Sequence, residues 1–426
     1  MSAPASTSER HVTIVGAGIV GVIAAVFAQK AGFTVRIIDK VDPGRGCSYA
    51  NGAAISPDFC VPIAAPDILK KVPRWLADPE GPLYLRWSYL PKAFSYLLHW
   101  AGQSRTEAVL RNAAGMRALH RDGLKIYAEL LGSAMGDLIQ VPGAAMVYRA
   151  PLKQPGGELA WRIYDSFGVE VQALGPTELR ELDPNLSHVF NSGLFFPASG
   201  HTTNPFRLVT TLAEGFVRNG GEIIRDEVRG IKLNADGEVG LATGRGELPG
   251  GKVVIAAGIG SRMFAAGLGD SLPMIGERGY FVMLPSPGVV PPVKISDRDL
   301  MFGLTPLETG LRISGTVELD SPDAPMNQTR ARSMLAHAKI MYPRLEDADA
   351  EFGMGVRPTT PDSMPFIGRS SRSPKVLYAF GHGHFGLNGA PATGRLISDF
   401  LSDRTPFIDP APYRPQRFST RQESIH

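Results

Sequence analysis

The sequence contains very little cysteine. Only two of its 426 residues are cysteine, Cys47 and Cys60. Two thiols cannot supply a disulfide framework or a cysteine-rich metal site. This composition is typical of proteins from a reducing compartment, so we expect a cytoplasmic location and no metal centre.

The sequence also lacks an excess of charge of either sign. It has 44 basic and 41 acidic residues, and no block of basic residues stands out. Proteins that bind nucleic acids usually carry a basic patch or stripe. We therefore expect a small-molecule substrate and no nucleic-acid partner, which argues against a nucleic-acid-modifying protein.

Long apolar runs are absent as well. Residues 12–28 are the most apolar stretch, but glycines interrupt them and they are too short to span a bilayer. A signal peptide is the alternative, and the amphipathic segment that follows, ending in Asp39, argues against it. A peripheral contact with the inner face of the cell membrane stays open.

Glycine, in contrast, is abundant, and its arrangement near the N-terminus is informative. Residues 12–15 are predicted to form a buried strand, and a helix is predicted over 22–30. Between them stand Gly16, Gly18 and Gly21 in the pattern Gly-x-Gly-x-x-Gly. The first permits a tight turn, the second lets the backbone approach a pyrophosphate, and the third lets the helix pack on the strand.

A second predicted strand, residues 34–39, completes this unit. It ends in Asp39, where an acidic side chain can accept hydrogen bonds from a ribose diol. The amide groups and positive dipole end of the helix face the phosphates. We therefore predict a dinucleotide site, which also includes Ile19, Val20 and Lys40.

Residues 43–57 form a loop of small side chains after the second strand. The loop would cross the carboxyl edge of the sheet, where ligands of open α/β folds bind. A flexible linker is the alternative, but the loop is too apolar for that. We expect these residues of the loop to contact a flat ring system: Cys47, Ser48, Asn51, Gly52, Ala53 and Ile55. Cys47 is a covalent attachment point, a reactive thiol or simply a small buried residue.

The middle of the chain alternates between predicted helices and strands. One long amphipathic helix is predicted over 105–131, and a helix over 206–219 begins with Asn204 as its N-cap and Pro205 at its first position. Another helix is expected over 330–341. Strands are expected at 144–149, 192–196, 221–231, 252–258, 279–284, 300–304 and 311–317. Val228 would place its backbone at an adenine edge, and Ala257 and Gly258 would end a strand beside the cofactor.

A second glycine loop repeats the opening arrangement near the C-terminus. A strand over 376–380 and a helix over 390–401 flank residues 381–388, Gly-His-Gly-His-Phe-Gly-Leu-Asn. Its residues Gly383, His384, Gly386, Leu387 and Asn388 are predicted to contact the cofactor. A metal site at His382 and His384 is the less favoured alternative, because the sequence offers no cysteine and few acids nearby.

With both loops in view, the chain resembles the D-amino-acid oxidase superfamily, and within it the FAD-dependent D-amino acid dehydrogenases. The most specific segments are 48–57, 279–280, 355–362 and 381–388. The resemblance implies FAD bound in an extended form, with its flavin between two domains. It assigns the substrate carboxylate to Arg357 and places the backbone amides of 386–388 at the flavin pyrimidine.

The physical case for Arg357 stands beside the resemblance, since a planar guanidinium can clamp a carboxylate through two hydrogen bonds. A structural salt bridge is the alternative. Tyr280 is expected to reach the same carboxylate, with a core tyrosine as the alternative, and His201 is expected to line the pocket.

The predicted fold is α/β, with a Rossmann-like FAD-binding domain and a second α+β substrate domain built on a mostly antiparallel sheet. The FAD-binding domain is predicted to be discontinuous, and the remaining core forms the substrate domain. The ranges are 10–60, 200–262 and 352–410 for the first, 61–199 and 263–351 for the second, and 1–9 and 411–426 for tails.

We predict oxidation of a D-amino acid, or of a cyclic D-imino acid such as hydroxy-D-proline. A hydride moves from the substrate Cα to flavin N5, and the imine is hydrolysed to a 2-oxo acid. The alternative is an amine oxidase or dehydrogenase of the glycine, sarcosine or L-proline type. The expected electron acceptor is a quinone, an electron-transfer protein or a dye rather than oxygen, an expectation that comes from the resemblance alone.

Overall fold

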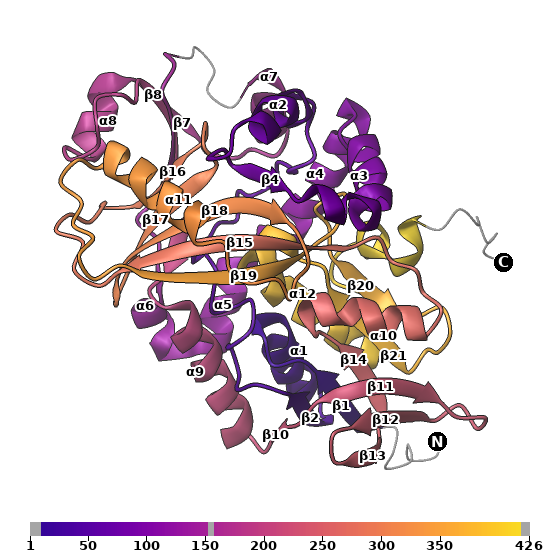
Figure 1. Ribbon diagram of the computed structural model, residues 1–426. Coiled ribbons are helices and arrows are strands. Elements are labelled where there is room, and N and C mark those ends of the chain that lie inside the picture. Colours follow the sequence, from indigo (N-terminus) through magenta and orange to yellow (C-terminus); the bar gives the residue numbers. More distant parts are fainter. Residues whose placement is uncertain (1–9, 152–156, 419–426) are drawn as a thin grey trace.

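The computed structural model describes residues 10–151 and 157–418 (Figure 1). Two large sheets dominate the molecule: a parallel sheet in the lower part of Figure 1 and a larger, mostly antiparallel sheet above it. The predicted N-terminal tail, residues 1–9, lies outside the described residues.

The parallel sheet has six strands in the order β10-β2-β1-β14-β21-β20. All neighbouring pairs are parallel except β20 with β21. The strands are β1 (His11–Val15), β2 (Thr34–Asp39), β10 (Glu222–Arg225), β14 (Lys252–Ile255), β20 (Phe366–Arg369) and β21 (Val376–Phe380). The predicted strands in this sheet are confirmed, whereas β20 was not predicted.

Helices cover both faces of this sheet. One face packs against α1 (Ile19–Lys30), α4 (Thr106–His120), α5 (Gly123–Leu131), α9 (Pro205–Arg218) and α12 (Gly386–Leu401). The other face packs against α10 (Ser261–Gly267) and a small sheet of β11 (Val228–Leu233), β12 (Val239–Thr243) and β13 (Gly246–Pro249). Asn204 caps α9 as predicted, because its side chain accepts hydrogen bonds from the amides of Phe206 and Arg207.

Two predicted elements are divided in the structure. The helix expected over 105–131 breaks at Arg121 and Asp122 into α4 and α5, since Asp-Gly favours a turn over a continuing helix. The strand expected over 221–231 breaks at Asp226 and Glu227, where the chain leaves the parallel sheet for the small one. The apolar stripe of the broken helix still packs in the core, as predicted for Met116.

The larger sheet contains nine strands and is mostly antiparallel, which confirms the predicted fold class. Only β16 with β6 and β18 with β4 pair in parallel. The strands are β4 (Leu83–Leu85), β6 (Ala144–Tyr148), β7 (Gln172–Leu174), β8 (Ser192–Phe196), β15 (Ile275–Leu284), β16 (Lys294–Asp297), β17 (Phe302–Leu307), β18 (Gly310–Leu319) and β19 (Glu351–Thr359). Helix α11 (Gln328–Met341) packs on β15 and β18 (Figure 1).

Three short strands form a small connecting sheet, and five further helices complete the described part of the fold. The short strands are β3 (Ala54–Ile55), β5 (Ile139–Gln140) and β9 (Gly200–Thr202). The helices are α2 (Pro66–Ala77), α3 (Leu90–Gln103), α6 (Met135–Leu138), α7 (Glu158–Ser166) and α8 (Pro176–Leu182). Short 3₁₀ turns are η2 (Trp87–Tyr89), η3 (Gly132–Ala134), η4 (Gly258–Gly260), η5 (Gly383–Phe385), η6 (Ala411–Tyr413) and η7 (Pro415–Phe418).

Two predicted domain boundaries differ from the structure. Strand β19, assigned above to the FAD-binding domain, pairs along its length with β15 in the larger sheet. Residues 411–418, predicted as part of a tail, are packed onto the molecule: the Tyr413 hydroxyl donates to the Gly115 carbonyl over 2.7 Å, and Arg417 pairs with Asp362 at 2.7 Å. Residues 419–426 lie outside the described residues.

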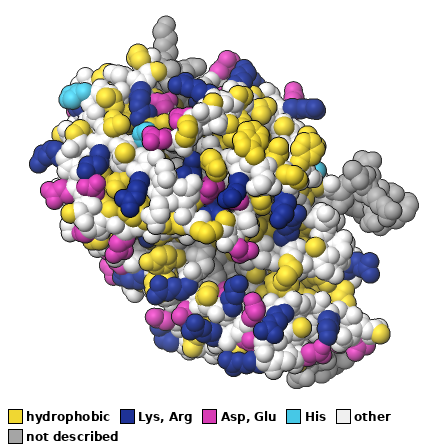
Figure 2. Space-filling model, viewed as in Figure 1, with side chains coloured by type: hydrophobic (Ala, Val, Ile, Leu, Met, Phe, Trp, Pro, Cys, Tyr) yellow, Lys and Arg dark blue, Asp and Glu magenta, His cyan; other side chains and the backbone are white. Residues whose placement is uncertain are grey.

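The face of the molecule seen in Figure 2 carries mixed charge and an apolar patch. Figure 2 shows acidic and basic side chains interspersed on the face in view, with hydrophobic side chains gathered at its upper right, where Figure 1 places α3. Trp87, Phe94 and Leu98 are the most exposed large apolar residues there, at 71%, 56% and 59%. Among residues 10–151 and 157–418, no helix is both long and apolar enough to cross a bilayer.

Candidate active site

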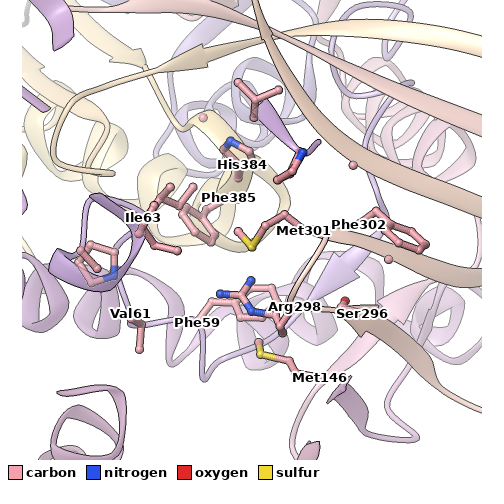
Figure 3. A pocket seen from close by; sticks show the side chains of 18 of the residues that line it. Phe59, Val61, Ile63, Met146, Ser296, Arg298, Met301, Phe302, His384 and Phe385 are labelled. Carbon is pink, nitrogen blue, oxygen red and sulfur yellow. The ribbon is translucent and has the colours of Figure 1, made fainter. Parts of the chain in front are cut away.

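A cavity of about 730 Å³ opens between the larger sheet and the two segments predicted to contact a ring system, residues 47–54 and 383–385. Its volume suits a small-molecule site. Figure 3 shows apolar side chains converging on it from several elements, among them Phe59, Ile63, Met146 and Phe385. Ionisable side chains also line it, among them Glu277, Lys294, Arg298, Arg357 and His384.

Arg357 lines this cavity, and Gly279 makes room for it. The two lie on the adjacent strands β19 and β15, where Gly279 pairs with Gly355. A Cβ atom on Gly279 would come within 2.0 Å of the Arg357 Cζ atom, so the guanidinium lies flat over the glycine. The guanidinium donates to the carbonyls of Thr316 at 3.0 Å and Gly315 at 3.4 Å. Since it carries five N–H donors, others remain for a ligand.

A histidine–glutamate pair lies beside Arg357. The His384 Nε2 atom is 2.7 Å from the Glu277 Oε2 atom, and Glu277 pairs in register with Arg357. Burial acts to raise the pKa of Glu277, but the hydrogen bond and charge of His384 and the charge of Arg357 outweigh it and hold that pKa below its ordinary value. Glu277 is therefore ionised, and it neutralises part of the buried positive charge.

The prediction for Tyr280 is wrong. Alternate residues of a strand point to opposite faces, so Glu277 and Gly279 face the cavity while Tyr280 faces away from it. Tyr280 is 1% exposed and lies in the core, where its hydroxyl contacts Glu318 and accepts from the Asn327 amide at 3.2 Å. Arg278, on the same face, pairs with Glu318 at 3.3 Å. Tyr280 thus belongs to a buried polar network behind the sheet.

The prediction for His201 is also wrong. His201 lies in the middle strand of the three-stranded connecting sheet, paired with Ala54 and Gln140, and it does not line the cavity. Burial, together with the charge of Lys294, lowers the pKa of His201 to about 4. It is therefore a neutral, buried residue at neutral pH.

The first glycine loop has the geometry that a pyrophosphate site needs. Gly16 has a φ of +115°, and a Cβ atom there would lie 2.4 Å from the Ala256 carbonyl oxygen. A Cβ atom on Gly21 would lie 1.9 Å from the Gly16 carbonyl oxygen. Asp39 accepts a hydrogen bond from the Ala17 amide over 2.6 Å, which joins the end of β2 to this loop. The residues present thus fit a dinucleotide cofactor such as FAD.

Most of the predicted cofactor residues fall into two groups. Five line the cavity: Cys47, Asn51, Gly52, Gly383 and His384. A second group lies at the carboxyl ends of β1, β2 and β14 and in the segments that follow them, with Val228 at the start of β11: Gly16, Gly18, Ile19, Val20, Gly21, Asp39, Lys40, Ser48, Val228, Ala257 and Gly258. Ser48 belongs there because its hydroxyl accepts from the Ile19 amide, at the start of α1, over 3.0 Å. Their roles toward FAD stay predictions.

The other predicted cofactor residues lie at the start of α12 and beneath the small-residue loop. Ala53, Ile55, Leu387 and Asn388 are buried. The Asn388 side chain accepts from the Ser56 amide at 2.6 Å and donates to the Ala54 carbonyl at 3.2 Å. It therefore fastens the loop to α12, which begins at Gly386 with no side-chain cap. The amides of this first turn remain the predicted contacts to a flavin.

Neither cysteine is in a disulfide, and both line the cavity. Burial raises the pKa of Cys47, although the charge of Arg357 opposes this, so the thiol is protonated at neutral pH. Of the residues described, none form a His, Cys, Asp and Glu cluster able to hold a metal ion. His382 contacts Thr393 at 2.8 Å and His384 contacts Glu277, so the two histidines have different partners.

Sequence reasoning missed several lining residues, above all Glu277, Lys294 and Arg298. For Glu277 a signal existed, because strand alternation from Gly279 places it on the Arg357 face. For Lys294 and Arg298 there was none, since β16 was not predicted and its position in the sheet depends on long-range pairing with β17 and β6.

The chain is similar to known flavoenzymes along almost its whole length. A sequence profile of the DAO family, described as FAD dependent oxidoreductase, matches residues 11–400. The chain is 37% identical to a D-amino-acid oxidase of Bradyrhizobium diazoefficiens, over 96% of this chain and 99% of that protein. It is 32% identical to a D-amino acid dehydrogenase of Paramagnetospirillum magneticum, over 92% and 95%.

The fold agrees with this. The structure superposes on glycine oxidase from Geobacillus kaustophilus with a TM-score of 0.74, at 20% identity, covering 96% of this chain and 99% of the other. Together, the profile match along 11–400 and the relatives above 30% identity show that the chain belongs to the DAO family of FAD-dependent oxidoreductases.

Proposed function

We propose that this protein oxidises a D-amino acid to an imine, which water hydrolyses to a 2-oxo acid. The observation that carries the proposal is Arg357, held flat over Gly279 in a cavity between the larger sheet and both predicted flavin-contacting loops. The names of the two relatives above 30% identity support the choice of D-amino acids.

In this reaction the chain's residues bind and orient the substrate. Arg357 would take the α-carboxylate through paired hydrogen bonds, which fixes the Cα–H bond in one direction. The apolar walls formed by residues such as Phe59 and Phe385 would exclude water. The chemistry that FAD supplies when bound is acceptance of the hydride from Cα. Given a neutral amine, no protein base is needed for that step.

Anaerobic reduction of the bound flavin by a substrate panel tests the proposal. The purified protein should be yellow, with about one FAD per chain, and D-amino acids should bleach it faster than their L-enantiomers. Bleaching by glycine, sarcosine or L-proline, but by no D-amino acid, would move the assignment to the alternative activity. Protein that cannot be reconstituted with FAD would refute both.

We further propose that the electron acceptor is a quinone, an electron-transfer protein or a dye rather than oxygen. The dehydrogenase among the relatives supports this, while the relative at 37% identity is named an oxidase. Turnover in air should therefore release peroxide much more slowly than a dye is reduced. Equal rates would make the protein an oxidase.

A peripheral contact with a membrane is part of the same proposal. The exposed Trp87, Phe94 and Leu98 form an apolar patch beside α2, which carries Lys70 and Lys71. Apolar side chains with basic neighbours suit the interface of an anionic bilayer. Sedimentation with anionic vesicles should fall when Trp87 and Phe94 are both replaced by Ser, and no binding by the parent protein would remove this part of the proposal.

A further inference from the structure

A second arginine reaches into the cavity. Arg298 directly follows β16, and Figure 3 shows its side chain beside Met301, with Met146 and Phe59 nearby. Burial raises the pKa of the Tyr148 hydroxyl, which comes from β6, and the nearby charge of Arg298 opposes this rise. Arg298 therefore presents a guanidinium to the part of the cavity that Phe59, Met146 and Met301 line.

Arg298 has no carboxylate partner within residues 10–151 and 157–418. Its neighbours Asp297 and Asp299 both pair with Arg149, at 2.7 Å and 3.6 Å. Asp58, another acid of the cavity wall, pairs with Arg117 at 3.2 Å. Asp67, a further acid of the described wall, makes no ion pair with Arg298, and Lys294 is a nearby cation whose amine contacts Ser296 at 2.8 Å.

The register of the larger sheet sets the spacing of the two arginines. The Arg357 guanidinium extends from β19 across β15 to the Gly315 carbonyl on β18. In the same row, Gly315 pairs with Phe302, and Phe302 pairs with Asp297, the residue before Arg298. The Gly315 carbonyl, which holds the Arg357 guanidinium, and Asp297, which precedes Arg298, are therefore separated by two strand spacings of about 4.8 Å, or roughly 10 Å. Since the Arg298 side chain extends from β16 into the cavity, the space between the two guanidinium groups suits a short ligand with an anionic group at each end.

We propose that the substrate is an amino or imino acid with a second carboxylate, its α-carboxylate on Arg357 and its side-chain carboxylate on Arg298. This rests on the proposed function and names its substrate class. An apolar substrate would bury the Arg298 guanidinium without an anion, which is costly. A site built around such a charge discriminates strongly against a neutral analogue.

The test compares D-glutamate with D-glutamine, which has nearly the same shape but no side-chain charge. The parent enzyme should favour D-glutamate in kcat/KM by about tenfold or more, and Arg298→Met should abolish that preference. Arg298→Lys, which keeps the charge, should retain part of it. The matched control is Arg262→Met, since Arg262 is an exposed residue of α10 outside the cavity. It should leave the preference unchanged.

Binding without turnover separates this inference from the proposed function. By calorimetry, glutarate should bind the parent protein about tenfold more tightly than butyrate, and Arg298→Met should remove the difference. If glutarate binds in this way but no D-amino acid reduces the flavin, the proposed function fails and the anion site stands. If D-glutamate and D-glutamine are oxidised equally well by the parent enzyme, the inference is overturned.

Discussion

At the scale of single residues, Arg357 and Gly279 form one unit. The guanidinium occupies the space above Gly279 that any other side chain would fill, and two carbonyls of β18 hold it there. Glu277, the residue of β15 that pairs directly with Arg357, supplies a buried counter-charge. The position of the arginine is thus set by the absence of a side chain as much as by its hydrogen bonds.

Arg357→Lys should be far from a conservative change. Lysine keeps the charge but loses the planar pair of donors, so the Cα–H bond would no longer be fixed. Losing one charge-assisted hydrogen bond costs about 1.5–3 kcal/mol, or roughly one to two orders of magnitude in kcat/KM. Arg357→Ala should cost more, while flavin content stays near normal. Steady-state kinetics on the best amino acid check this, and unchanged kcat/KM in both variants would make Arg357 structural.

Gly279→Ala should mimic the loss of Arg357, because the new Cβ atom takes the place of the guanidinium. We expect kcat/KM to fall by about tenfold or more, and the double variant Gly279→Ala/Arg357→Ala to be no worse than Arg357→Ala alone. The control is Gly240→Ala in β12, where the new methyl group would meet only the Lys232 Cβ atom at 3.9 Å. Additive losses in the double variant would show that the two residues act separately.

At the scale of elements, α1 and α12 are held together by a close approach at Gly394. A Cβ atom on Gly394 would lie 2.7 Å from the Ile23 Cγ2 atom and 3.0 Å from the Ile23 backbone. Both helices begin at the glycine loops predicted to contact FAD. Their packing therefore sets the distance between the two loops.

Gly394→Val should lower the free energy of unfolding by about 1–3 kcal/mol, since overpacking forces the helices apart. It should also weaken FAD binding, because the loops move with the helices. Gly102→Val in α3, where nothing lies within 4 Å of a new Cβ atom, is the matched control and should change stability little. Thermal unfolding and FAD titration measure both effects, and equal stability of the two variants would contradict this account of the packing.

At the scale of the whole molecule, buried histidines make stability depend on pH. Burial lowers the pKa of His120, His201 and His382, to about 4 for the first two and about 3 for the third. Each binds a proton more readily when unfolded, at an ordinary pKa of about 6.5. The contribution of these neutral histidines to the free energy of unfolding is therefore complete above pH ~6.5 and is lost as the pH falls toward ~4.

Stability should accordingly fall between pH 6.5 and 4, and His120→Asn should flatten that fall. Asparagine can replace the contact of 2.6 Å between the His120 Nδ1 atom and the Phe59 carbonyl without titrating. The fall of the His120 pKa from an ordinary 6.5 to about 4 corresponds to roughly 3 kcal/mol at most. Urea unfolding at pH 7 and pH 5 measures the difference, and an identical pH dependence in the variant would exclude His120 as a source.

Local sequence determined the parallel sheet and the two glycine loops. The run of glycines between Val15 and Val22, the acid at the end of the second strand and the Asn-Pro start of α9 act over a few residues, so pattern alone predicts them. These features depend on backbone conformation and capping, which neighbouring residues control.

Only the tertiary structure decided which side chains share the cavity. Tyr280 stands next to Gly279 in the chain yet faces the opposite side of the sheet, and His201 is enclosed between two short strands. Arg298 reaches the cavity because β16 joins the sheet through pairing with β17 and β6, the latter about 150 residues away. Such pairings come from burial of apolar surface between distant segments, which no local pattern encodes.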